Sequence, residues 1–319
     1  MLLKRLLAAL AVAAVLPAAA QEYPAKTVRI VVSFTAGGTT DVIARQIANR
    51  LAHHWKQTVI VENKPGAGGT LGTDYVVAQP ADGYTFLMSS SGPIAISPML
   101  GRKLANDPGT ALEPVVLVAD VANVLVTNPD YKSKSVPELV KDAKARPGAL
   151  NYASTGVGTV AHLAGAAFSD KAGIETTHVP YKGAEAVADV MAGRVDFMFA
   201  TLPSVIGNLK GGKLVALGQV APTRVKALPN VPTMKEVGYE GLENGSWFGL
   251  FAAKGTPKAI IDKMNAQVNE ILKEPETMEA LERQGATPKG GSPEDYKKFI
   301  AEDIAFWRPV VVKTGAKAN

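Results

Sequence analysis

The chain has 319 residues, a formal net charge of +5 and no cysteine. The absence of cysteine excludes a disulfide framework, a thiolate metal site, a cysteine nucleophile and a lipid attached at a cysteine. The charged residues are scattered and form no run of Lys and Arg, so the sequence lacks the pattern of a nucleic-acid-binding surface.

The start of the chain is typical of an export signal. Two basic residues precede an unbroken apolar run at 6–16, and small residues follow it at 18–20. The run is shorter than the roughly 20 residues that span a bilayer. We therefore expect residues 1–20 to be a signal peptide cleaved near Ala20, and the mature protein to be periplasmic and not lipid-anchored.

The first part of the mature chain alternates between strand and helix patterns. Runs rich in Val and Ile predict strands, and apolar residues at helical spacing predict helices. We expect strands at 27–34, 58–61 and 84–88, and helices at 41–55 and after the glycine-rich turn 65–69. This alternation indicates a mostly parallel sheet with helices on both faces. The long apolar stretch 113–128 predicts a segment that runs from this unit into a second one.

The alternation restarts after that stretch. Ser135, Pro137 and Glu138 have the spacing of a capping box with proline in the first turn, which predicts a helix to residue 145. We expect further strands at 151–154, 174–179, 195–200, 214–220 and 247–252, and helices at 159–171, 183–192, 257–273, 276–284 and 293–307. The last strand and helices are expected to return to the first unit.

The whole pattern predicts an α/β protein of two lobes with a hinge between them. We expect lobe 1 to comprise 21–127 and 246–319, and lobe 2 to comprise 128–245. A chain that leaves one lobe and comes back to it makes two crossings, and two crossings suit a hinge-bending motion.

Two glycine-rich turns each follow a predicted strand and open a predicted helix. The first contains Gly37 and Gly38, with Thr40 or Asp41 as the candidate N-cap, and the second contains Gly158. Free N–H groups at a helix start bind anions, and ligands of α/β sheets bind where strands lead into helices. Facing each other across a cleft, the two helix starts would hold an anion through backbone amides, because no arginine lies in either turn.

Two further turns are expected to reach the same cleft. Tyr181 follows one predicted strand, and Ala200 and Thr201 lie at the end of another. The carboxyl ends of parallel strands meet at one edge of a sheet, so these residues become additional candidates for contact with a ligand.

Cofactor and metal motifs are sparse. Gly156, Gly158 and Ala161 match the spacing of a dinucleotide fingerprint, but the acidic residue at the required distance, Glu175, starts the next strand instead of ending it. We therefore expect no cofactor. The four histidines lack the spacing of metal ligands, so we expect no metal site.

Two alternatives to a binding protein remain open at this point. Ser154 and His162 would be the nucleophile and base of an exported serine hydrolase, although no carboxylate is placed by the sequence to orient the imidazole. A sensor module that docks on a receptor kinase when loaded would share the ligand chemistry of a transport protein.

Seven segments, in order along nearly the whole mature chain, carry a family resemblance. They are FTAGGTTD at 34–41, ENKPGAGG at 62–69, ADGYT at 81–85, GTVAHLAG at 158–165, HVPYKG at 178–183, LPNVPT at 228–233 and GLFAAKGTP at 249–257. Together they resemble the Bug family, the TctC-like periplasmic solute-binding proteins of tripartite tricarboxylate transporters. The resemblance implies a Venus-flytrap (type II periplasmic-binding-protein) fold that captures a small carboxylate without catalysis and passes it to integral membrane transporter subunits.

The resemblance also implies which residues hold the ligand. Backbone amides of two turns hold a carboxylate in the family, often through ordered waters. These turns correspond to Ala36, Gly37, Gly38 and Asp41 in lobe 1 and to Ser154, Thr155, Gly158, Thr159 and His162 in lobe 2, with Ala200 and Thr201 as further candidates. Many members have proline where this chain has Thr35 and Thr39. Family ligands include amino acids, dicarboxylates, citrate and aromatic acids, and the choice among them stays open.

Overall fold

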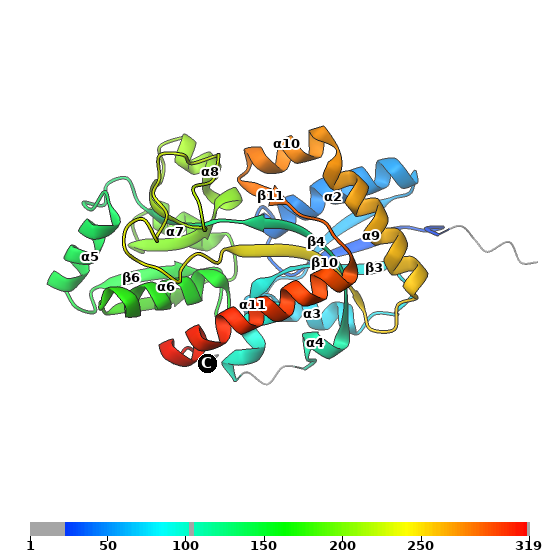
Figure 1. The fold of residues 1–319 in the computed structure, drawn as a ribbon, viewed down its shortest axis with the longest axis horizontal. Helices are drawn as coiled ribbons and strands as arrows, with labels where there is room; N and C mark the ends of the chain where they lie inside the picture. The colour runs from blue at the N-terminus through cyan, green and yellow to red at the C-terminus, as the bar shows by residue number, and fades with distance from the viewer. Residues whose placement is uncertain (1–22, 102–104, 318–319) are drawn as a thin grey trace, which may run out of the picture.

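The fold consists of two β-sheets that lie side by side, each covered by helices (Figure 1). The computed structural model describes residues 23–101 and 105–317. The expected signal peptide and its cleavage near Ala20 lie outside these residues. Within them, no helix is both long enough and apolar enough to cross a membrane.

The larger sheet, which we call the sheet of lobe 1, has the strand order β11-β4-β10-β3-β1-β2. Its strands are β1 (Val28–Val32), β2 (Val59–Asn63), β3 (Thr85–Ser90), β4 (Leu112–Val121), β10 (Ser246–Ala253) and β11 (Ala286–Pro288). β1 pairs in parallel with β2 and β3, whereas β10 runs antiparallel to β3 and β4. The buried Val and Ile residues of these strands explain why their sequence pattern is so apolar.

Helices cover both faces of this sheet. They are α2 (Thr39–Trp55), α3 (Thr70–Val77), α4 (Pro108–Ala111), α9 (Lys258–Lys273), α10 (Pro275–Arg283) and α11 (Pro293–Thr314), with the short turns η1 (Ala67–Gly69), η2 (Gly92–Ile96) and η3 (Ser97–Leu100). Ile43 and Ile47 of α2 pack with Met264 of α9 on one face. On the other face, Trp247 of β10 packs against Tyr296 of α11.

The second sheet, that of lobe 2, has the strand order β7-β6-β8-β5-β9. Its strands are β5 (Asn123–Thr127), β6 (Leu150–Ser154), β7 (Thr176–Pro180), β8 (Phe197–Thr201) and β9 (Val215–Val220). The helices are α5 (Val136–Ala145), α6 (Val160–Ala172), α7 (Glu185–Met191) and α8 (Leu202–Lys210). Two apolar clusters, one on each face of the sheet, give this part a core of its own.

The sheets are mixed, which corrects the expectation of mostly parallel strands. Among the described strands, parallel pairs are β1 with β2 and β3, and β6 with β7 and β8, and an isolated parallel bridge joins Gln219 to Thr233. The strands next to the crossings, β4, β5, β9 and β10, pair antiparallel with their neighbours. β5 and β10 enter their sheets from the other lobe and run against the strands of the local strand–helix–strand units. β4 and β9 pair antiparallel because their neighbours in the sheet are β10 and β5.

The chain crosses between the lobes next to Ala122 and again before Ser246. The apolar stretch expected as one segment forms two strands, β4 in one sheet and β5 in the other. The first crossing therefore lies before residue 127. The sequence could not locate this crossing, because the apolar pattern continues through both strands without a break. Ser246 Oγ donates a hydrogen bond to Asn123 Oδ1 at 2.8 Å, which ties the two crossings together.

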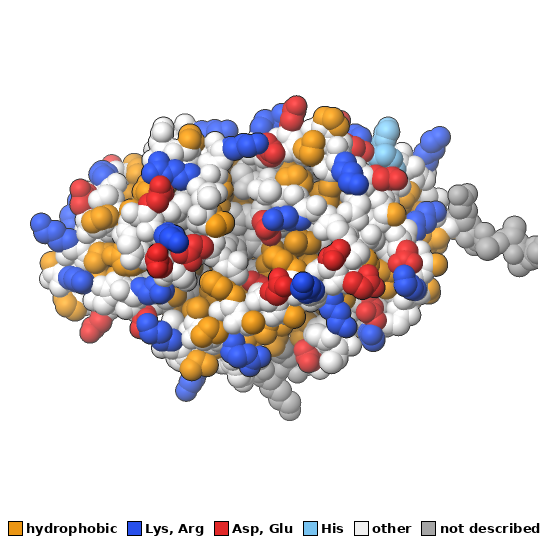
Figure 2. Space-filling view, viewed as in Figure 1, with side chains coloured by type: hydrophobic (Ala, Val, Ile, Leu, Met, Phe, Trp, Pro, Cys, Tyr) orange, Lys and Arg blue, Asp and Glu red, His pale blue; other side chains and the backbone are white. Residues whose placement is uncertain are grey.

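Helix α11 is a third link between the lobes, and it was not expected from the sequence. It packs on β4 and η2 of lobe 1 and also on α6 of lobe 2 (Figure 1). The buried carboxylate of Asp303 accepts hydrogen bonds from Trp247 Nε1 at 2.8 Å and Asn244 Nδ2 at 2.7 Å. These bonds fix α11 to the second crossing. On the face shown in Figure 2, acidic and basic side chains are interspersed, in agreement with the scattered charge of the sequence.

Candidate ligand-binding cleft

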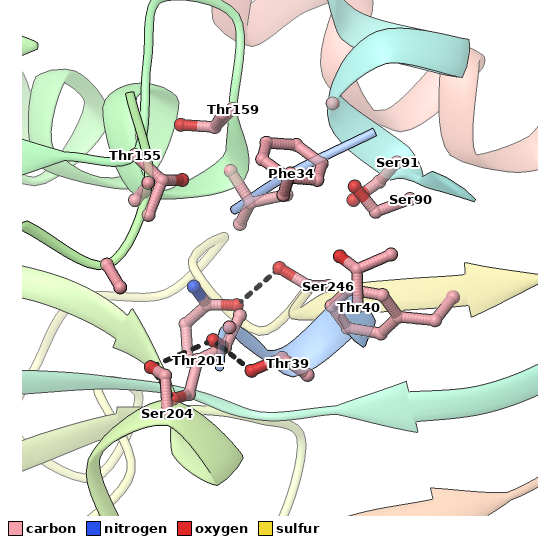
Figure 3. Close-up of a pocket in the computed structure, with 18 of the residues that line it drawn as sticks. Phe34, Thr39, Thr40, Ser90, Ser91, Thr155, Thr159, Thr201, Ser204 and Ser246 are labelled. Atoms are coloured by element: carbon pink, nitrogen blue, oxygen red, sulfur yellow. Dashed lines mark hydrogen bonds between the residues drawn. The ribbon is translucent and has the colours of Figure 1, made fainter. Parts of the chain in front are cut away.

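A cavity of about 70 Å³ lies between the two lobes, close to the crossings (Figure 3). Its wall combines hydroxyl groups with apolar side chains from both sheets. It is lined by Phe34, Thr35, Gly38, Thr39, Thr40, Ser90, Ser91, Gly92, Asn123, Thr155, Thr159, Val160, Ala161, Gly183, Ala184, Val187, Met198, Thr201, Ser204, Ser246 and Phe248. The volume is enough for several water molecules, and it is below the ~300 Å³ at the lower end of drug-sized pockets.

The first glycine-rich turn leads from β1 into α2 and brings the start of that helix to the cavity. Gly38, in an extended conformation, is the N-cap, and no side chain caps the helix. This corrects the expectation that Thr40 or Asp41 is the N-cap. The first N–H groups of the helix, those of Thr39 and Thr40, therefore lack a side-chain acceptor at the point where both residues line the cavity.

Asp41 stands behind this turn and holds its shape. Its carboxylate accepts hydrogen bonds from Gly37 N at 3.0 Å and Asn63 Nδ2 at 2.9 Å, and it pairs with Arg45 at 2.9 Å. Burial alone would raise the pKa of Asp41, but the bonds from Arg45, Gly37 and Asn63 bring it below its usual value. The side chain does not line the cavity, and Ala36 and Gly37 are exposed outside it.

The second glycine-rich turn leads from β6 into α6. Thr159 is its N-cap: Oγ1 accepts from His162 N at 3.4 Å and donates to Gly156 O at 2.8 Å. Thr155 and Thr159 line the cavity, together with Val160 and Ala161 in the first turn of the helix. The starts of α2 and α6 thus open onto the same space from different lobes.

Ser154 and His162 lie behind the second turn. The Ser154 side chain is completely buried, and its Oγ lies 2.6 Å from His178 Nε2 and donates to Gly156 O. His162 Nδ1 accepts from Gly158 N at 3.3 Å, and its ring stacks on His178 with centroids 4.1 Å apart. Burial lowers the pKa of His162 to about 4 and that of His178 to about 3, so both rings are neutral at neutral pH.

This arrangement does not provide the Ser154–His162 pair of a hydrolase. Ser154 pairs with His178 instead, and its hydroxyl does not line the cavity. The hydrogen bonds that these side chains make go to the backbone of the second turn and to each other. Their observed contacts are those of residues that hold a loop in place.

Among the other candidate residues, some line the cavity and others lie outside its wall. Thr201 lines the cavity at the end of β8, whereas Ala200 is buried in that strand and Gly158 is not part of the wall. Tyr181 donates its hydroxyl to Asp189 at 2.6 Å and also lies outside the wall.

Sequence reasoning missed a third turn at the cavity. Ser90 at the end of β3, Gly92 at the start of η2 and Ser91 between them line the wall. Their signal was present in the sequence, since the segment Ser-Ser-Ser-Gly follows a predicted strand. Asn123 and Ser246 at the crossings and Ala184 before α7 were missed as well, whereas Gly183 belongs to the turn after residue 180 that was expected to reach the cleft.

No acidic or basic side chain and no histidine is among the described residues that line the cavity. The Ser91 hydroxyl is buried there and has no hydrogen-bond partner among the residues that the structure describes. An unpartnered buried hydroxyl costs free energy unless a guest supplies the missing bond. Helix starts and hydroxyl groups are therefore the polar groups with which this cavity can meet a ligand.

Comparison with known proteins identifies the family. Residues 43–316 match the model of the tripartite tricarboxylate transporter family receptor. The chain belongs to this family. It is 40% identical over 307 residues to Protein BugT of Bordetella pertussis, covering 94% of this chain and 93% of that protein.

Solved structures of similar proteins support the same assignment. R. palustris Rpa4515 with adipate is 35% identical, with a TM-score of 0.91 and coverage of 93% of this chain and 99% of that one. MatC from Rhodopseudomonas palustris with bound malate is 31% identical, with a TM-score of 0.86 and coverage of 91% and 100%. The chain is a Bug-type, TctC-like periplasmic solute-binding protein with the two-lobed α/β fold that the sequence predicted.

Proposed function

We propose that this receptor-family protein captures a small carboxylate-bearing solute in the cleft between its lobes and delivers it to the membrane subunits of a tripartite transporter. The observation that carries the proposal is the meeting of two helix starts, that of α2 without a side-chain cap and that of α6 capped by Thr159, at one cavity whose described lining has no charged side chain. Helix N-termini stabilise negative charge, and their effect is strong where water is excluded.

The ligands of similar proteins support the choice of a carboxylate. Structures with adipate and with malate are among those most like this one, and both ligands are dicarboxylates. The wall of the cleft also contains the apolar side chains of Phe34, Val187 and Met198. We expect a carboxylate at one helix start and an aliphatic or hydroxylated body along these side chains.

The direct test is isothermal titration calorimetry of the mature protein with mono-, di- and tricarboxylates. Binding of at least one carboxylate with a Kd of about 1 μM or lower, ~−8 kcal/mol, is the expected result. Sugars and metal ions serve as negative controls. Binding of a sugar or metal, with no carboxylate bound at millimolar concentration, would refute the proposal.

Ser91→Ala tests whether the unpartnered hydroxyl meets the ligand. Its loss should weaken binding of the preferred carboxylate by about tenfold, the effect of a hydrogen bond to a charged group. His53→Ala is the control, because His53 is exposed in the last turn of α2, whose first turn is at the cavity. Equal affinities of the Ser91→Ala variant and the wild-type protein would exclude a contact between Ser91 and the ligand.

A further inference from the structure

Besides the Ser246–Asn123 bond at the crossings, two hydrogen bonds between described residues of the cavity wall join one lobe to the other. Thr39 Oγ1, at the first residue of α2, lies 2.7 Å from Thr201 Oγ1, at the end of β8. Thr35 Oγ1, in the turn before α2, accepts from Ala184 N at 3.1 Å.

We propose that Thr35 and Thr39 form a latch with Ala184 and Thr201 that stabilises the closed form of the protein before any ligand binds. The inference rests on the proposed function, in which closure of the lobes traps a solute. Each bond joins residues of different lobes, so it exists only when the lobes are together. In an open form the same groups would bond to water.

The hydroxyl groups of the latch form a directed chain (Figure 3). Thr201 Oγ1 donates to Ser204 Oγ at 3.1 Å, and Ser204 Oγ donates to Thr201 O at 2.7 Å. Thr201 therefore uses its own hydrogen within lobe 2 and offers a lone pair to Thr39, which becomes the donor across the cleft. Successive hydrogen bonds of this kind polarise and strengthen one another.

The second bond depends on close packing at Gly183. A Cβ atom at this position would stand 2.1 Å from Thr35 Oγ1. The lack of a side chain lets the turn before α7 approach Thr35 closely enough for Ala184 N to donate. The sequence therefore supplies a glycine in lobe 2 opposite a threonine in lobe 1.

Under a competing interpretation, the functional partner of the Thr39 hydroxyl is the ligand and not Thr201. Both threonines line the cavity, so a change in ligand affinity alone does not separate the two roles. The separating measurement is the distance between the lobes without ligand. A latch affects that distance, whereas a ligand contact does not.

The absence of cysteine allows spin labels to be placed at two introduced cysteines only. Asn49→Cys on α2 and Lys144→Cys on α5 are exposed sites in different lobes. Pulsed electron–electron double resonance on the ligand-free protein measures the distribution of distances between the two labels, and this distribution gives the ratio of closed to open forms. Thr39→Val should lower this ratio roughly three- to tenfold, the range for one net hydrogen bond, and Thr35→Val should act in the same direction.

Thr39→Ser keeps the hydroxyl and should restore the wild-type ratio, while Thr110→Val, an exposed threonine on α4, controls for loss of a hydroxyl elsewhere. Circular dichroism checks that each variant is folded. A distance distribution of Thr35→Val/Thr39→Val identical to that of the wild-type protein would overturn the proposal. Failure of every carboxylate to bind would refute the proposed function and leave these ligand-free distances as an independent result.

Discussion

Asp41 shows how a single buried side chain can shape a binding turn without touching the cavity. Its carboxylate collects bonds from Gly37, Asn63 and Arg45, and thereby fixes the backbone that leads to the free amides of Thr39 and Thr40. Removal of the carboxylate leaves these donors without their common acceptor. The role is that of a positioning residue.

We therefore expect Asp41→Ala to lower the free energy of unfolding by about 2–3 kcal/mol and to weaken carboxylate binding at the same time. Urea denaturation and calorimetric titration measure the two effects. Asp41→Asn keeps one acceptor oxygen and should lie between the wild-type protein and the alanine variant. A loss of affinity without any loss of stability would instead indicate direct contact of Asp41 with the ligand.

At the same residue scale, the sequence located the turns better than it assigned their side chains. Gly38, Thr155, Thr159 and Thr201 line the cavity, but Asp41 and its counterparts Ser154 and His162 in lobe 2 point to the backbone behind it. Strand-to-helix spacing identifies a turn at the edge of a sheet. It does not determine the χ angles that aim a side chain at the ligand or away from it.

At the scale of elements, the sequence predicted the α/β alternation but not how the strands pair across the crossings. Local strand–helix–strand units produce the parallel pairs of β1 and β6. The antiparallel pairs involve strands far apart in the chain, such as β4 with β10, and local periodicity carries no information on them. The packing of α11 on α6 was not predicted for the same reason.

The stacked pair His162 and His178 connects α6 to β7 and gives this contact a dependence on pH. Burial holds the pKa of His162 near 4 in the folded protein, below its usual 6.5. The contribution of the two neutral histidine rings to folding stability is fully present above pH 6.5, where these histidines are also neutral in the unfolded chain. Between pH 6.5 and 4 the histidine of the unfolded chain becomes protonated while that of the folded chain stays neutral. The free energy of unfolding therefore decreases as the pH is lowered.

The lowered pKa of His162 alone corresponds to a loss on the order of 3 kcal/mol by pH 4. His162→Gln should therefore show a flatter dependence of stability on pH than the wild-type protein over this window. Urea denaturation at pH 7, 6, 5 and 4 measures the slopes. His53→Ala, which replaces an exposed histidine, should follow the wild-type slope. Parallel curves for His162→Gln and the wild-type protein would contradict the assignment.

At the scale of the whole molecule, closure depends on how near the backbones of the two lobes can come. Gly68 in η1 of lobe 1 has φ +66°, and a Cβ there would stand 2.3 Å from Val157 O in the second turn of lobe 2. A carbonyl oxygen of the main chain cannot swing aside as a long side chain does. A residue larger than glycine at this position must therefore hold the lobes apart.

Gly68→Ala should leave both lobes folded but raise the Kd for the carboxylate more than tenfold, because the closed form no longer fits together. Small-angle X-ray scattering with saturating ligand should show a larger radius of gyration than for the wild-type protein. The matched control is Gly173→Ala after α6, where φ is +60° and no atom lies within 4 Å of the added Cβ. Both substitutions carry a left-handed penalty of about 1 kcal/mol, and only Gly68→Ala adds the clash. Equal affinities of the two variants would show that the approach of Gly68 to Val157 is not needed for binding, and that closure is limited elsewhere in the cleft.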